Sequence, residues 1–211
     1  MGKEMNKSLR VSVVAGGALA LFALVATALV AVTFSGTKER IAENEKQFLL
    51  RNLHELVTKD MHTNDMYSDK IQLIAPELAG KKEKITVYRA RSGQMPAAVI
   101  MAVIAPDGYT GAIHLLVAIN ANDGKLIGVR VIKHRETPGL GDGIEIKKSN
   151  WILGFDQKSL FDPIRKKWAV KKDGGDFDQL TGATITPRAI IKAVRKTLEL
   201  YASKRHMLFD Q

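Results

Sequence analysis

The feature that most constrains this chain is an apolar run near its N-terminus. Residues 11–34 contain no charged side chain. An α-helix rises ~1.5 Å per residue, so a run of this length exceeds the roughly 30 Å hydrocarbon core of a bilayer. We therefore expect residues 11–34 to form one transmembrane helix, preceded by a short cytoplasmic segment at residues 1–10.

A cleaved signal peptide is the alternative for this run. Lys3, Lys7 and Arg10 form a basic start, and residues 26–28 have the small-residue pattern of a cleavage site. The apolar run continues beyond that point, so cleavage would leave an apolar mature N-terminus, and an uncleaved anchor is favoured. Basic residues also follow the run, so charge counting alone does not decide its orientation. A cytoplasmic N-terminus with the bulk of the chain outside is allowed.

Residues 35–84 are predicted to hold an amphipathic helix and a connecting segment. From Thr37 on, apolar side chains recur at helical spacing among charged residues, at Ile41, Phe48, Leu49, Leu53, Leu56 and Val57. This helix either continues from the membrane span or is hinged just after it. Its apolar stripe packs on the chain's own domain or against a partner subunit. Pro76 and Gly80 break the periodicity of residues 62–84, where we expect a loop with short elements.

Residues 85–205 are predicted to form an α+β domain with an antiparallel sheet and flanking helices, and residues 206–211 a C-terminal tail. Four β-prone runs lie at residues 85–88, 97–104, 113–119 and 126–132, with turn residues between them. Residues 151–178 are irregular and rich in charge and glycine. Helical spacing returns at residues 185–201, where we expect Thr186 as the N-cap and Pro187 at the first helical position.

Composition narrows the possible chemistry. The chain has no cysteine, which excludes disulfides, thiolate-ligated iron–sulfur clusters and a cysteine nucleophile. Any redox chemistry must therefore come from a bound organic cofactor. The net charge is +10, but Lys and Arg are spread along the chain without a nucleic-acid-binding module, so we expect no nucleic-acid partner. The histidines show no metal-ligand spacing, and we expect no metal site.

Two short segments have the composition of a ligand site. The first is residues 134–141 (HRETPGLG), which follow a predicted strand and combine a proline and two glycines with polar side chains. Such a loop lets backbone amides approach a flat ligand closely. An ordinary strand-exit turn has the same composition, so the loop alone leaves both interpretations open.

The second segment is residues 178–184 (DQLTGAT), which come directly before the C-terminal helix. Its small residues leave space around the hydroxyl of Thr184, and a helix N-terminus favours an anion such as a phosphate. The alternative is a capped helix start, in which Thr184 and Thr186 only bond to backbone amides.

Both segments resemble the G subunit of the Rnf electron-transport complex and, more distantly, the C subunit of the sodium-translocating NADH:quinone oxidoreductase. The resemblance covers nearly the whole chain, including the apolar run, residues 108–111 (GYTG), the loop at 134–141, residues 150–152 and residues 168–188. Its specific part is the family spacing of Asp178, Thr181, Gly182, Ala183 and Thr184. The ETPGLGD sequence suits the Rnf protein better than its counterpart in the quinone oxidoreductase.

The resemblance implies that Thr184 carries FMN through a phosphoester bond. A separate, magnesium-dependent flavin transferase would install it and would recognise Asp178, Thr181, Gly182 and Ala183.

The resemblance also implies that residues 136–141 of this loop line the isoalloxazine ring. The cofactor-binding residues implied are Glu136, Thr137, Pro138, Gly139 and Leu140.

The implied function is electron relay in an ion-translocating ferredoxin:NAD oxidoreductase, with no independent catalysis by this chain. The implied partners are the other membrane subunits of the complex. The implied location is the bacterial cytoplasmic (inner) membrane, crossed once, with the FMN domain on the periplasmic side. The alternatives are a component like the C subunit of the sodium-translocating quinone oxidoreductase, a free-standing FMN carrier, and a structural assembly protein with an unmodified Thr184.

Overall fold

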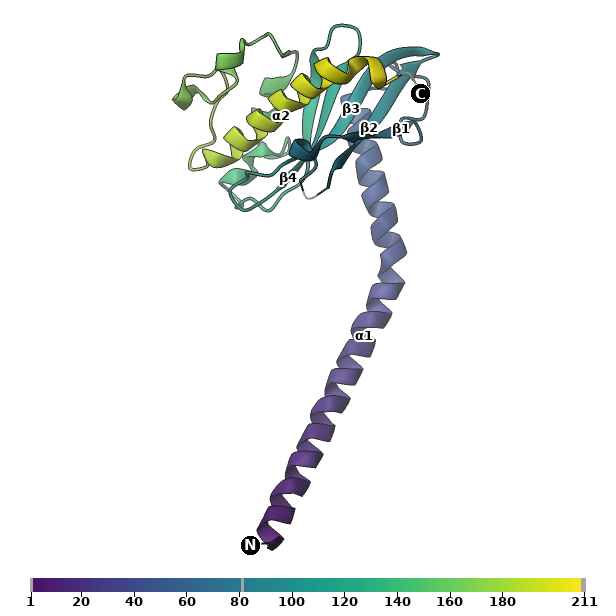
Figure 1. The fold of residues 1–211 in the computed structure, drawn as a ribbon, viewed down its shortest axis with the longest axis vertical. Helices are drawn as coiled ribbons and strands as arrows, with labels where there is room; N and C mark the ends of the chain where they lie inside the picture. The colour runs from purple at the N-terminus through teal and green to yellow at the C-terminus, as the bar shows by residue number, and fades with distance from the viewer. Residues whose placement is uncertain (1, 81, 210–211) are drawn as a thin grey trace. The chain divides into compact units, whose positions relative to one another are not determined.

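The computed structural model describes the backbone of residues 2–80 and 82–209, and the side chains from residue 9 onward within those ranges. The chain divides into two compact units between Phe48 and Leu49. The first unit is most of helix α1, which runs from Gly2 to Leu56. The second is an α+β domain that begins with the last turns of α1 (Figure 1).

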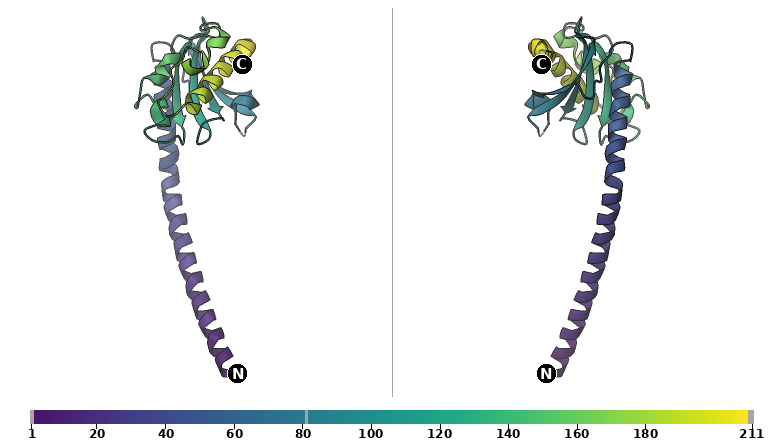
Figure 2. Two further views of the ribbon diagram at one scale, coloured as in Figure 1. Left: turned by 90° about the vertical axis from the view of Figure 1, so that its left-hand side faces the viewer. Right: turned by 90° about the vertical axis from the view of Figure 1, so that its right-hand side faces the viewer.

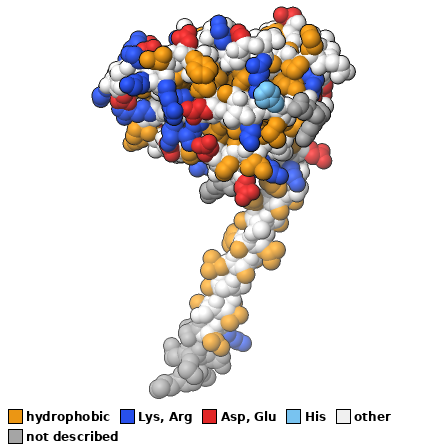
Figure 3. Space-filling model, turned by 45° about the horizontal axis from the view of Figure 1, so that its top comes forward, with side chains coloured by type: hydrophobic (Ala, Val, Ile, Leu, Met, Phe, Trp, Pro, Cys, Tyr) orange, Lys and Arg blue, Asp and Glu red, His pale blue; other side chains and the backbone are white. Residues whose placement is uncertain are grey.

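Helix α1 continues without a break from the apolar run into the charged stretch that follows. The sequence left a continuous or a hinged helix open, and the continuous one is observed. Large apolar side chains of the run are exposed, such as Phe22 at 76%, and they follow α1 in Figure 3. The helix is long and apolar enough to cross a membrane, with a mean hydropathy of 2.5 over its most apolar window. A bilayer removes this surface from water, which is favourable for apolar side chains.

The C-terminal end of the predicted apolar stripe packs on the domain. Leu53 and Val57 are fully buried and Leu56 nearly so, whereas Ile41 is 50% exposed and Phe48 40% exposed. Packing on the chain's own domain is therefore confirmed for the last turns of the helix.

The sheet is a simple antiparallel meander. Its strands pair in chain order: β1 (Lys70–Ile74), β2 (Lys84–Ser92), β3 (Met95–Ala105), β4 (Ile113–Asn120) and β5 (Leu126–Lys133). Four of these confirm the β-prone runs, with β2 continuing to Ser92. The expectation of about four strands was wrong by one, because β1 lies in the segment predicted to be loop. Strand β1 is a five-residue edge strand with no fully buried side chain, so its apolar signal is weak.

Both faces of the sheet are buried. Cross-strand neighbours Val87, Met101, Val117 and Val129 lie on one face. Alternate residues of the same strands form a second cluster with Leu53, Leu56 and Val57. Because side chains alternate across a strand, a sheet covered on both faces has nearly continuous apolar strands. Figure 2 shows the sheet between helix α2 (Ile185–Lys204) and the last turns of α1.

Short 3-10 helices make up much of the remaining domain. They are η1 (Pro76–Leu78), η2 (Gly141–Ile144), η3 (Trp151–Phe155), η4 (Arg165–Lys167), η5 (Lys171–Asp173) and η6 (Arg205–Met207).

An aromatic cluster holds the irregular segment at 151–178 together. The ring of Phe155 lies 5.4 Å from Trp151, 6.3 Å from Trp168 and 4.8 Å from Phe177, centroid to centroid. The indole N–H of Trp151 donates to the carbonyl of Asp178 at 2.6 Å. Through this bond the cluster fixes the backbone at the start of the segment that leads to Thr184.

Candidate functional site

The two segments singled out in the sequence meet at one cavity of about 320 Å³. The loop after β5 supplies one wall, and the start of α2 supplies the other. The lining residues are Tyr109, Glu136, Thr137, Leu140, Gly141, Gly182, Ala183, Thr184, Ile185 and Thr186.

Glu136 lines this cavity and connects three parts of the chain. Its side chain is 4% exposed. One carboxylate oxygen accepts from the backbone N–H of Thr110 at 3.1 Å and from the Thr110 hydroxyl at 3.2 Å. The other accepts from the hydroxyl of Thr186. A buried carboxylate needs such donors, because an unpaired charge away from water is strongly unfavourable. Glu136 therefore joins its own loop to the segment before β4 and to α2.

This arrangement corrects the prediction for the helix start. Helix α2 begins at Ile185, with Thr184 at the N-cap position. Thr186 was expected to cap the helix, but its side chain is buried and bonds Glu136 instead. Pro187 lies in the first helical turn, at the third position and not the first. Its missing N–H does no harm there, because the first amides of a helix have no partner within it.

Two glycines allow the close approach of the two walls. A Cβ at Gly141 would lie 2.9 Å from both the Cβ and a carboxylate oxygen of Glu136. Gly182 has a φ of +77°, and a Cβ there would lie 3.0 Å from Leu140. The second glycine sits in a tight turn closed by a hydrogen bond from the Ala183 N–H to the Leu180 carbonyl at 3.1 Å. Side chains at these positions would push the walls apart.

The beginning of the loop is fixed by His134. The backbone N–H of Glu136 donates to Nδ1 of His134 at 3.0 Å, so this nitrogen acts as an acceptor. The other ring nitrogen, Nε2, lies 2.7 Å from a carboxylate oxygen of Glu145 and is thereby assigned as the donor. This pair sets the direction in which the chain leaves β5.

Thr184 is the chemically distinctive residue of the cavity. It is half-buried, lines the cavity and stands at the N-terminus of α2. Its side chain makes no capping bond, and its hydroxyl has no hydrogen-bond partner among the described residues. The capped helix start that the sequence left open is thus not the arrangement observed.

Six of the ten predicted site residues line the cavity: Glu136, Thr137, Leu140, Gly182, Ala183 and Thr184.

The other four lie outside the lining. Pro138, Gly139 and Thr181 are exposed. Asp178 is also exposed, and its carboxylate lies 2.5 Å from the ammonium group of Lys171. These four positions face solvent, where they are open to another protein.

Sequence reasoning placed Gly141 in the loop along the ring, named Tyr109 and Thr186 without assigning them to the site, and did not single out Ile185. Tyr109 lies in the GYTG segment of the family resemblance, which was the available signal. Its side chain is 67% exposed, and those of Leu140 and Ile185 are 48% and 46% exposed. These three exposed apolar groups give the cavity the surface that a planar ring system requires.

The arrangement fits a flavin nucleotide. The volume lies near the lower end of the roughly 300–1,000 Å³ that is usual for cofactor sites. Apolar side chains suit a flat ring, and the free hydroxyl at a helix N-terminus suits a phosphate. In agreement with this geometry, a family model described as the FMN-binding domain matches residues 108–199, which include every lining residue. The fold and the site define an FMN-binding protein.

A second family model, the RnfG N-terminal region, matches residues 5–56. The G subunit of the ion-translocating oxidoreductase complex of Shewanella amazonensis is 46% identical over 190 residues, covering 90% of this chain and 88% of the relative. The G subunit of the Pseudomonas aeruginosa complex is 48% identical over 190 residues, again covering 90% and 88%. This chain belongs to the family formed by the G subunits of ion-translocating oxidoreductase complexes. A solved structure of NqrC from Shewanella oneidensis has a TM-score of 0.48 at 22% identity, covering 70% of this chain and 75% of that one.

Proposed function

We propose that this chain carries FMN esterified through its phosphate to Thr184 and relays electrons within a membrane-bound ion-translocating oxidoreductase complex. One observation carries the covalent part of the proposal. Thr184 lines the cavity, and its hydroxyl has no hydrogen-bond partner among the described residues. A hydroxyl kept free of intramolecular bonds is available for esterification.

The surrounding residues have distinct roles in this proposal. The N-terminus of α2 stabilises the phosphate ester through its unpaired N–H groups and the positive end of the helix dipole. Glu136 holds the loop and α2 at a fixed separation. Tyr109, Leu140 and Ile185 line the cavity and would contact the ring. FMN, when bound, supplies the redox chemistry, and the protein sets its position and its electrostatic surroundings.

The proposal includes a flavin transferase as a partner during maturation. Asp178, Thr181 and Gly182 are exposed on the segment that precedes Thr184. The tight turn at residues 180–183 presents Thr181 and Gly182 at the surface. A separate enzyme can therefore read this segment without unfolding the domain.

The proposal also places the chain in the bacterial cytoplasmic membrane, with α1 crossing once and the FMN domain on the outer face. The apolar length of α1 supports a single crossing. The other subunits of the complex are the expected neighbours, as the names of the relatives indicate. Protease added to cells whose outer membrane is permeabilised and whose cytoplasmic membrane is intact should digest the domain. Digestion only from the cytoplasmic face would reverse this orientation.

The test of the covalent site uses two threonines of the same cavity. Thr184→Val keeps the side-chain shape and removes the hydroxyl, so denatured protein in a gel should lose its flavin fluorescence. Thr137→Val removes another lining hydroxyl and should keep the fluorescence. Fluorescence that survives Thr184→Val would show that the flavin is attached elsewhere.

A further inference from the structure

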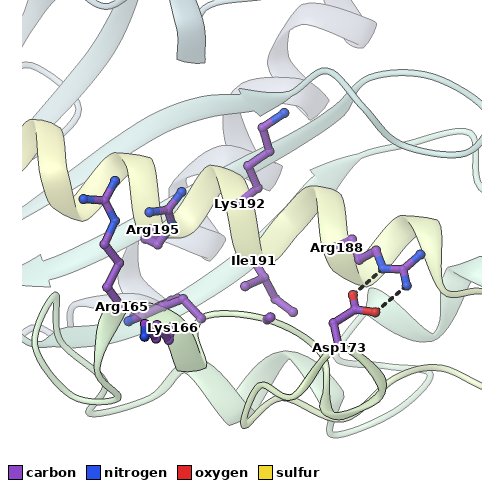
Figure 4. Close-up of a pocket in the computed structure, with 9 residues that line it drawn as sticks. Arg165, Lys166, Asp173, Arg188, Ile191, Lys192 and Arg195 are labelled. Carbon is purple, nitrogen blue, oxygen red and sulfur yellow. Dashed lines mark hydrogen bonds and ion pairs between the residues drawn. The ribbon is translucent and has the colours of Figure 1, made fainter.

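A second hollow lies further along the same helix. It has a volume of about 480 Å³, with α2 on one side and the segment around η4 and η5 on the other (Figure 4). Five cationic side chains line it: Arg165, Lys166, Arg188, Lys192 and Arg195. We call this hollow the basic groove. Figure 3 shows Lys and Arg side chains gathered on one side of the domain.

The sequence explains why these charges meet. Residues 188, 192 and 195 recur at helical spacing, so they share the face of α2 opposite its buried stripe. Arg165 and Lys166 belong to the short helix η4, which Figure 4 shows facing α2.

The groove has a net positive charge. Asp173 is the only carboxylate among its lining residues in the described part of the chain, and it is bound to Arg188 by two hydrogen bonds of 2.7 Å. Two carboxylates beside the groove pair with three more of its cations: Asp107 lies 2.5 Å from Lys192, and Glu199 lies 3.1 Å from Arg195 and 3.6 Å from Arg165. Five cations therefore meet three carboxylates. Lys166 has no ion pair with any residue that the structure describes. Cations held together in a concavity focus positive potential there, and an anionic partner relieves their mutual repulsion.

The groove adjoins an exposed apolar surface. Phe161 is 83% exposed and Ile164 is 63% exposed. Both line a neighbouring hollow of about 490 Å³, and Arg165 borders this hollow as well as the groove. Apolar anchors beside charged positions are typical of protein interfaces. A small anion would leave Phe161 and Ile164 unused. A flat membrane surface would contact projecting charges more readily than charges that line a concavity.

We propose that the basic groove, together with Phe161 and Ile164, is the docking surface for an acidic segment of another subunit of the membrane complex. This inference rests on the proposed function, because it requires that the chain works within such a complex. Thr186 lines the flavin cavity, and Arg188 lines the groove two residues further along α2. A protein docked in the groove therefore lies beside the flavin site.

The absence of cysteine makes a direct test possible. Lys166→Cys gives the full-length chain one thiol in the groove, and a thiol-linked photo-crosslinker can be attached to it. Lys84→Cys is the matched control, because Lys84 is exposed and lies outside the groove. The labelled chains are irradiated in native membranes and the crosslinked peptides are identified by mass. The groove position should crosslink to an acidic segment of another subunit of the oxidoreductase complex, and the control should not.

A charge-reversal pair gives the independent measurement. Arg165→Glu with Lys166→Glu should lower the yield of partner subunits that co-purify with the tagged chain by about tenfold. Lys84→Glu with Lys125→Glu changes the net charge equally at exposed positions outside the groove and should leave the yield unchanged. Flavin fluorescence should persist in both variants, because neither pair touches the flavin cavity.

The outcomes separate the docking surface from the proposed function. Normal co-purification of the complex with the groove variant would refute the proposed docking surface. Crosslinking of the groove position only to lipid, or no more than the control, would refute it as well. The proposed function would stand in each of these cases. If the wild-type chain brings down no other subunit of the oxidoreductase complex, both are overturned.

Discussion

Glu136 illustrates what single residues contribute to this site. The family resemblance predicts a position along the flavin ring, and the structure places the residue in the cavity lining. No local pattern indicated that its carboxylate would also connect the loop, Thr110 and Thr186. These partners are separated from Glu136 by 26 and 50 residues. Such pairings depend on the tertiary fold and cannot be read from neighbouring residues.

The charge of Glu136 leads to the first prediction. A carboxylate beside the ring disfavours added negative charge, because like charges repel more strongly where water is excluded. Glu136→Gln is nearly isosteric and should raise the flavin midpoint potential while the covalent bond to Thr184 remains. Redox titration of the purified chain measures the potential, and intact mass measures attachment. An unchanged potential in fully flavinylated protein would mean that the charge of Glu136 does not act on the ring.

Substitutions at Asp178 and Lys171 can separate recognition of Asp178 by the flavin transferase from a structural role of the ion pair between these two residues. Their ion pair is exposed, with side-chain exposures of 71% and 60%, and such pairs contribute only about 0–1 kcal/mol to stability. Asp178→Ala should therefore keep the fold but reduce flavin incorporation by cells that contain the transferase. Lys171→Ala breaks the same ion pair and should leave incorporation normal. Equal losses in the two variants would indicate that the ion pair, and not recognition of Asp178, is required.

At the scale of elements, the β-prone runs and the helical spacing predicted β2 to β5 and α2 because these elements bury apolar side chains. The same reasoning failed for β1, which is short, lies at the edge and is only partly covered. It also misplaced the start of α2. A threonine before a helix is usually a cap, but here tertiary contact with Glu136 takes the hydroxyl of Thr186.

The contact between β5 and η3 contains an unusual carboxylate. One oxygen of Asp156 is buried without a hydrogen-bond partner in the described part of the chain. A Cβ at Gly128 would lie 3.4 Å from this oxygen and 3.0 Å from Leu56, so the glycine permits the close packing of β5 with its neighbours. Burial raises the pKa of Asp156 above its ordinary value of 3.8, and the charge of Arg130 opposes this only in part.

This raised pKa predicts a pH-dependent stability. Asp156 is protonated in both states below pH 3.8, and its contribution to stability is lost as the pH rises through the folded-state pKa. Asp156→Asn removes the buried charge, so the variant should unfold at a higher temperature than the wild type at neutral pH. The difference should shrink as the pH falls toward 3.8. Thermal unfolding in detergent across this range measures it, and a variant less stable at neutral pH would show that the attraction to Arg130 dominates.

At the scale of the whole molecule, sequence and structure agree on one apolar helix followed by one α+β domain. The domain boundaries predicted at residues 34 and 84 stay predictions. Helix α1 runs through residue 34 without a break. The apolar helix was predictable because a long run without charged side chains is visible directly in the sequence. The basic groove could not be predicted from the sequence, because its charges come from segments that are irregular or far apart in the chain.

The most direct test of the central claim is the intact mass of the full-length chain purified from its own membranes. We expect the mass of the polypeptide plus one FMN less one water, as a phosphoester requires. In Thr184→Val purified in the same way, the increment should be absent. A wild-type chain without the increment, or a Thr184→Val chain that retains it, would contradict the account.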